Sequence, residues 1–232
     1  MQFDLELLID SIPKLLRGTA MTLELVGIAL VVGGLLAIPI ALARLSRNPF
    51  LRAPAYGYIF FFRGGPLLVQ IYLVYYGSGQ FREFFEQIGL WSILREAYWC
   101  AIITFALNTA AYTAEILRGG IQGVPLGEIE AARACGMSRV MIYRRIIFPR
   151  AYRLALPAYG NEIVLMLKGS ALASVIALFD LMGWTRAIFA RHFALEIYVY
   201  AAVIYLVLTY LISRGIKRLE YRLSPDLRPP PA

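Results

Sequence analysis

The chain has 232 residues, a formal net charge of +8 and a hydrophobic content of 59%. Soluble globular domains are about 45–50% apolar, so this composition excludes an ordinary soluble fold and predicts an all-α, polytopic membrane protein. The sequence contains no G-x-x-x-x-G-K-[ST] phosphate-binding motif, and its one histidine and two cysteines have no metal-ligand spacing, which excludes an ATPase of that type and a metal enzyme.

The first segment, residues 1–19, is predicted to be an amphipathic lead-in helix. It contains acidic residues and lacks the basic start and small-residue cleavage site of a signal peptide. The first membrane span follows over about 20–43, where residues 25–43 form an uncharged run of 19 residues. About 20 apolar residues cross a bilayer core, and the glycines and the proline in this run are tolerated in a membrane helix.

The second span is predicted over about 53–79, and its one charged residue is Arg63. A short glycine and proline stretch directly after Arg63 interrupts the span. A charge at this depth is costly, so Arg63 either snorkels or pairs inside the bundle, or it contacts a solute directly. Residues 81–96 are predicted to form an interfacial helix, and the third span follows over about 97–117.

A polar, arginine-rich loop over residues 121–150 separates the third and fourth spans. A proline and two carboxylates near its start predict a short helix that ends near Cys135. Gly136 then permits a positive φ, Ser138 is placed to cap a second helix, and Pro149 is expected to end that helix. Two alanines beside a fixed charge would let a partner protein approach the backbone closely. The residues predicted to dock a partner ATPase are Glu128, Glu130, Ala131, Ala132, Gly136 and Ser138.

The fourth span is predicted over about 154–179 and the fifth over about 196–213, with an external amphipathic segment between them. The fourth span carries Glu162, an ionisable group that at this depth needs a cavity or a partner. A guanidinium group would match its carboxylate by a two-pronged, charge-assisted hydrogen bond. Arg63 is then either part of the solute site or the internal partner of Glu162. The candidate solute-binding residues are Asn161, Glu162, Ser170, Arg63 and Asp180.

The distribution of basic residues predicts the orientation of the five spans. One set of loops, together with the C-terminal tail, carries fifteen lysines and arginines, and the other set carries six. The positive-inside rule therefore places the loop 121–150 and the C-terminus in the cytoplasm and the N-terminus outside. This pattern attributes the net charge to membrane orientation rather than to nucleic acid. Residues 224–232 are predicted to be a disordered tail.

The loop has a recognisable spacing: Glu130-Ala131-Ala132, three residues, Gly136, nine residues, Ile146, and Phe148-Pro149 at its end. This spacing resembles the EAA loop of the membrane subunits of bacterial ABC importers and departs from it at Phe148, where leucine is usual. Three further segments resemble the polar amino-acid branch of these permeases, and most of all the permeases for histidine, lysine, arginine and ornithine or for opines. These segments are residues 62–70, 108–125 and 156–162.

The resemblance implies a type I importer fold over residues 20–223 and a permease role in the bacterial inner membrane. The solute it implies is a polar amino acid of the basic type or an opine. The implied partners are two copies of an ABC ATPase, a second permease subunit that is a copy or a paralogue, an external solute-binding protein and membrane lipid. ATP and Mg²⁺ would be bound by the ATPase, so no cofactor is expected in this chain.

An ion-gradient-driven secondary amino-acid transporter is the alternative. In that class Glu162 and Lys168, with Glu115 and Asp180, would serve as relays. A structural assembly subunit is a third class, and it leaves Glu162 and Arg63 unexplained. The EAA spacing favours the importer because an ion-driven carrier has no ATPase to dock.

Overall fold

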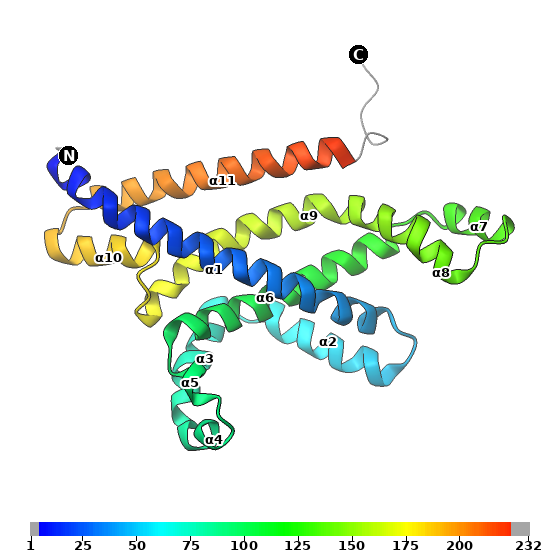
Figure 1. Ribbon diagram of the computed structural model, residues 1–232, viewed down its shortest axis with the longest axis horizontal. Helices are drawn as coiled ribbons and strands as arrows, with labels where there is room; N and C mark the ends of the chain where they lie inside the picture. The colour runs from blue at the N-terminus through cyan, green and yellow to red at the C-terminus, as the bar shows by residue number, and fades with distance from the viewer. Residues whose placement is uncertain (1–4, 224–232) are drawn as a thin grey trace, which may run out of the picture.

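The computed structural model describes residues 5–223, and the predicted disordered tail at 224–232 lies outside them. All regular elements of this part of the chain are helical, which confirms the predicted all-α fold. Figure 1 shows an elongated bundle from which α7 and α8 project at one end. The α-helices are α1 (Leu5–Leu45), α2 (Pro49–Gly64), α3 (Leu67–Gln80), α4 (Arg82–Gln87), α5 (Trp91–Leu94), α6 (Ala97–Gln122), α7 (Leu126–Ala134), α8 (Arg139–Ile142), α9 (Phe148–Gly169), α10 (Leu181–His192) and α11 (Glu196–Leu223).

Three of these helices are each long and apolar enough to cross a membrane, namely α1 from Ile9 onward, α6 and α11. Two bent pairs, α2 with α3 and the α8–α9 run with α10, raise the number to as many as five if each pair is one span. The predicted number of five spans is reached when each bent pair is counted as one span.

The predicted lead-in helix and first span form one continuous helix, α1. Its beginning packs inside the bundle, since Leu15 is 2% exposed and lies in a buried cluster with Leu181 of α10 and Ile197 of α11. Burial of this face against two other helices explains why the described part of the lead-in segment, residues 5–19, does not form a separate surface element.

The predicted second span is two helices, α2 and α3, that meet at 104°. Pro66 cannot donate a backbone hydrogen bond, so the helix breaks just before it. Buried side chains then take up the carbonyl groups freed at the break: Gln70 donates to the carbonyls of Phe62 and Gly65 at 2.8 and 3.0 Å. Asn108 of α6 donates to the same Phe62 carbonyl at 3.1 Å and to the Gln70 side-chain oxygen at 3.0 Å. The sharp bend is thus fixed by a satisfied polar network.

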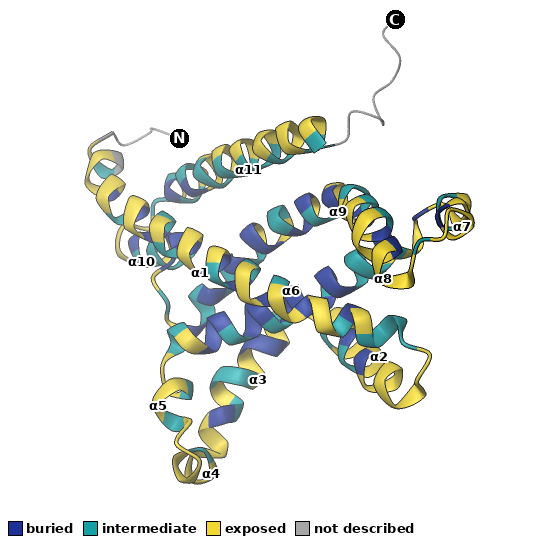
Figure 2. Ribbon diagram, turned by 45° about the vertical axis from the view of Figure 1, so that its right-hand side comes forward, coloured by how far each residue is buried: buried dark blue, intermediate teal, exposed yellow. Residues whose placement is uncertain are grey.

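Helix α6 is the centre of the bundle, as the burial colours of Figure 2 show. In its most apolar 18-residue window 67% of the residues are buried, compared with 11% in the window of α11. Glycines bring its neighbours close: a Cβ at Gly33 of α1 would lie 2.7 Å from the Ala106 carbonyl oxygen, and one at Gly120 would lie 2.6 Å from that of Ala151 in α9. Helices α1 and α9 are therefore packed directly on the α6 backbone.

The predicted interfacial helix over 81–96 is wrong as a single element, because it consists of the short helices α4 and α5. Gly89 lies between them with a φ of 74°, which a continuous helix cannot contain. The segment after the fourth span, predicted to be amphipathic and external, contains the helix α10, and a 3₁₀ helix at Ser170–Ile176 leads towards it.

Candidate functional site

The loop between α6 and α9 has the predicted helix, tight turn and helix. Helix α7 ends at Ala134, and Gly136 has a φ of 73°, as expected for a glycine-dependent turn. The turn is closed by backbone hydrogen bonds from Gly136 to Arg133 at 2.9 Å and from Met137 to Ala132 at 3.1 Å. The Ser138 hydroxyl accepts from the Met141 N–H at 3.4 Å and caps α8, which confirms the predicted cap.

The expectation that Pro149 ends the second helix is wrong. A π-helical turn at Tyr143–Ile147 joins α8 directly to α9, and Pro149 is the second residue of α9. The wider turn of the π-helix changes the hydrogen-bonding pattern just before the proline, and a missing N–H costs little at the start of a helical segment. The chain is therefore helical without a break from Arg139 to Gly169 (Figure 1).

The acidic and small residues of α7 lie in different settings. Glu128 is in the first turn and pairs with Arg150 at 3.5 Å. Glu130 lies two residues further on, is exposed, and makes no ion pair with any described residue. Ala131 is exposed, whereas Ala132 is 5% exposed and packs in a cluster with Ile142. Ala131 thus faces outward beside Glu130, and the small size of Ala132 serves the packing of the loop itself.

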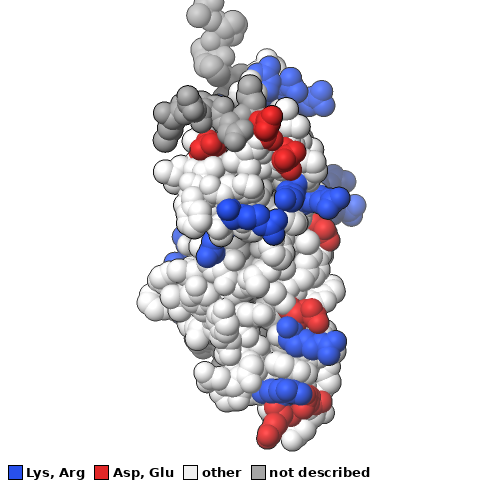
Figure 3. Space-filling model, turned by 90° about the vertical axis from the view of Figure 1, so that its left-hand side faces the viewer, with Lys and Arg blue, Asp and Glu red and all other residues white. Residues whose placement is uncertain are grey.

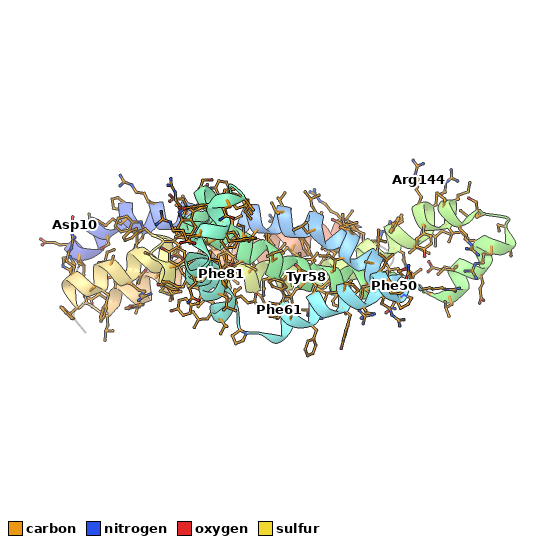
Figure 4. All side chains as sticks on the ribbon, turned by 90° about the horizontal axis from the view of Figure 1, so that it is seen from below. Asp10, Phe50, Tyr58, Phe61, Phe81 and Arg144 are labelled. Carbon is orange, nitrogen blue, oxygen red and sulfur yellow. The ribbon has the colours of Figure 1, made fainter. Side chains whose placement is uncertain are left out.

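Two cavities flank this loop. The first has a volume of about 820 Å³ and is lined by Arg47, Arg133 and Arg139 together with apolar side chains. None of these three arginines is in an ion pair within residues 5–223. The second, of about 550 Å³, is lined by both acidic and basic residues, Glu128 and Arg145 among them. In Figure 4, Arg144 extends away from the bundle at the same end of the molecule. The loop therefore presents an exposed basic surface interrupted by the carboxylate of Glu130.

Glu162 is deeply buried, with 4% of its surface exposed, and lies on α9 against α6. Thr109 of α6 lies beside its carboxylate, and the buried Thr109 hydroxyl makes no hydrogen bond to any described residue. The charge of Arg63 acts on Glu162 from beyond ion-pair distance. Glu162 lines none of the four cavities described for this structure. Its carboxylate is thus enclosed in this conformation.

The other predicted solute-binding residues do not gather around Glu162. Asn161 is exposed on the adjacent face of α9. Ser170 is fully buried and donates to the Leu167 carbonyl at 2.8 Å. Asp180 is also fully buried and caps α10 by accepting from the Gly183 N–H at 2.8 Å. Both Ser170 and Asp180 lie near Tyr205 of α11. The candidate set is therefore divided between the Glu162 region and the contact of α9 and α10 with α11.

An ion cluster around Glu115 of α6 is the main feature that the sequence did not reveal. Arg118 donates to both carboxylate oxygens, from Nη2 at 2.8 Å and from Nε at 3.0 Å. Arg44 at the end of α1 and Arg63 at the end of α2 lie 3.8 and 3.9 Å from the same carboxylate. The three-residue spacing of Glu115 and Arg118 is visible in the sequence, but the two long-range pairs are not.

Comparisons with known proteins agree with this architecture. Residues 29–225 match the family described as "Binding-protein-dependent transport system inner membrane component". The nopaline transport system permease protein NocM of Agrobacterium fabrum is 49% identical over 97% of this chain and 94% of its own length. The histidine/lysine/arginine/ornithine transport system permease protein HisM of Escherichia coli is 39% identical over 91% of this chain and 90% of its own. A crystal structure of an amino acid ABC transporter with histidines has a TM-score of 0.85 at 37% identity, covering 96% of this chain and 100% of that one.

Proposed function

Since the chain belongs to the family of inner membrane components of binding-protein-dependent transport systems, and is thus a permease subunit of an ABC importer for amino acids or opines, we propose that its solute is a basic amino acid or an opine. The observation that carries this proposal is the buried carboxylate of Glu162, with no ion pair among the described residues, in a chain similar to permeases for arginine-like solutes. The ion-gradient-driven alternative has no support in these comparisons.

The family implies ATPase partners and a second permease subunit. We propose in addition that two copies of the ATPase bind ATP and Mg²⁺, that an external protein delivers the solute, and that membrane lipid surrounds the apolar helices. This chain then has no ATPase site or cofactor of its own. The exposed apolar side chains along α11 support the lipid contact, since only 11% of its apolar window is buried.

The chain is a multi-pass inner membrane protein, and we propose that the α7–α8 loop and the C-terminus face the cytoplasm. The exposed arginines of the loop, Arg133 and Arg139 among them, support this orientation. Figure 3 looks at the opposite end of the molecule, where acidic and basic side chains are interspersed on a largely uncharged surface. Such a mixed surface is expected on the external side.

The unbroken helical run from α8 into α9 supports a mechanical link between the ATPase and the solute site. The ATPase would dock on the exposed face of α7, at Glu130 and Ala131. Its closure on ATP would shift α8, and α9 would carry that shift to Glu162 because the two helices are continuous. The solute can reach Glu162 only when the bundle opens, so docking and solute access would both bias one two-state equilibrium.

The test is Glu162→Gln in the assembled importer. A charge-assisted hydrogen bond is worth about 1.5–3 kcal/mol, so the KM for arginine uptake should rise roughly 10- to 100-fold. ATP hydrolysis without solute should stay unchanged, and Glu162→Asp should retain part of the affinity. Lys168→Gln is the matched control, because Lys168 is exposed on the same helix. An unchanged KM in Glu162→Gln would refute the role of this carboxylate.

A further inference from the structure

The cluster around Glu115 contains more positive charge than its carboxylate neutralises. Arg118 occupies both oxygens with hydrogen bonds of 2.8–3.0 Å. Arg44 and Arg63 approach only to 3.8 and 3.9 Å, and neither donates a hydrogen bond to Glu115. Two further guanidinium groups therefore share a carboxylate that already accepts hydrogen bonds at both of its oxygens.

Arg44 and Arg63 both line one cavity of about 310 Å³, together with Tyr56, Tyr112 and Glu115. Each guanidinium lies over a tyrosine ring, Arg44 over Tyr56 at 4.9 Å and Arg63 over Tyr112 at 5.1 Å. Stacking covers a face of the planar group and leaves the N–H groups at its edge for an acceptor.

Arg44 has hydrogen-bonding capacity that Glu115 does not use. Its Nε lies 3.8 Å from the Glu115 carboxylate, which is within ion-pair distance but too long for a hydrogen bond, and no described residue accepts from it. A guanidinium carries five N–H donors, so others remain for a second acceptor. The cavity thus combines excess positive charge, unused donors and open volume, which are the requirements of an anion site.

We propose that this cavity binds carboxylate groups of the transported solute, while Glu162 receives the cationic end of the same molecule. Arg63 connects the two regions because it is close to Glu115 and its charge also acts on Glu162. The solute class that uses both is a basic amino acid with additional carboxylates, as in an opine. This inference rests on the proposed function and narrows it to that class.

The experiment measures binding of three probes to the purified permease–ATPase complex without the external binding protein. The probes are agmatine, which lacks a carboxylate, arginine, and nopaline, an arginine with a dicarboxypropyl group on its α-nitrogen. The unsubstituted complex should bind nopaline most tightly and agmatine least. Arg44→Gln should weaken nopaline by at least about tenfold and leave agmatine within about twofold, because only the carboxylates lose a partner. Arg63→Gln should weaken nopaline by a similar factor and should not weaken agmatine, because it removes a positive charge that acts on Glu162.

The matched control is Arg52→Gln, since Arg52 is exposed on α2 and lines none of the cavities described above. Arg63→Lys and Arg44→Lys keep the charge but lose the planar fork, so they should give intermediate losses and remain informative if the glutamine variants fail to fold. Equal losses for all three probes, or no loss for nopaline, would overturn the carboxylate site. Failure of the unsubstituted complex to bind any probe would instead count against the proposed function.

Discussion

The arginines of the α7–α8 loop and those of the membrane bundle are in opposite settings. Around the loop, Arg133 and Arg139 are exposed and take part in none of the ion pairs of residues 5–223. In the bundle, Arg44, Arg63 and Arg118 converge on the largely buried Glu115. The loop thus leaves its charges available to another chain, whereas the bundle uses its charges to fix three helices around one carboxylate.

This difference predicts that acidic residues have different roles in the two regions. In the bundle, an acidic residue should matter mainly for folding, because its removal leaves several partly buried arginines close together without compensation. In the loop, it should matter mainly for association, because water solvates the arginines that remain. Substitutions of matched residues in the two regions test this contrast.

The largest effect is expected from Glu115→Gln. Removing one partner of a buried ion pair costs about 3–5 kcal/mol, and about 3 kcal/mol is the upper limit here because the Glu115 side chain keeps 16% exposure and its arginine partners keep 25–42%. The melting temperature of the purified complex should fall clearly. Glu128→Gln is the control, since its pair with Arg150 is partly exposed, at 40% and 27%, and should cost less than about 1 kcal/mol. Equal melting shifts in the two variants would contradict the contrast.

The next largest effect is expected from Glu130→Ala, in association rather than in stability. Truncating one partner of a charge pair that becomes desolvated at an interface costs about 2–5 kcal/mol of binding, and the lower end applies to Glu130 because it is exposed. Glu130 is exposed and lies beyond the first turn of α7, so its own helix gains little from its charge. Affinity for the ATPase should fall, while the melting temperature of the isolated permease should not. A lower melting temperature with normal ATPase affinity would show that Glu130 is a structural residue.

The local features of the loop were predictable from the sequence, and its continuation was not. Gly136 and Ser138 act through bonds and angles within a few residues, so their residue types were sufficient. The passage of the helix through Pro149 depends on a π-helical turn, which has no residue signature. The 104° bend before Pro66 was signalled only as an interruption, because its geometry depends on Asn108 of another helix.

The candidate solute site was predictable only in part. The cost of an ionisable group inside a membrane identified Glu162 and Arg63 as special. This criterion could not identify the residues that each of them contacts. Arg63, for example, lies 3.9 Å from Glu115, which is 52 positions away in the sequence. Asp180 met the same criterion, and in the structure it caps α10. A single sequence reports which charges are costly but not which other helix each one faces.

A moderate effect is expected from Gly136→Val. A β-branched residue at a φ of 73° is strained by about 1–3 kcal/mol, and the strain would change the angle between α7 and α8. Stimulation of ATP hydrolysis by loaded binding protein should decrease. Gly89→Val is a matched control, because Gly89 has a φ of 74° and an added Cβ would contact nothing within 4 Å at either glycine. The two variants should lose similar stability, and only Gly136→Val should lose coupling. Loss of coupling in both would indicate a general effect of strain.

The smallest effect is expected from Ser138→Ala. An N-cap is worth about 0.5–2 kcal/mol, and the lower end applies because the bond to the Met141 N–H is long, at 3.4 Å, and exposed. Loss of about 0.5 kcal/mol would loosen the start of α8. The concentration of loaded binding protein that gives half-maximal stimulation of ATP hydrolysis should then rise roughly twofold. Ser138→Asp should restore it, because aspartate caps a helix equally well. If Ser138→Ala instead reduced ATPase affinity as strongly as Glu130→Ala and aspartate failed to restore it, the hydroxyl would be a direct contact with the ATPase. The docking surface would then extend across the turn from α7 to the start of α8.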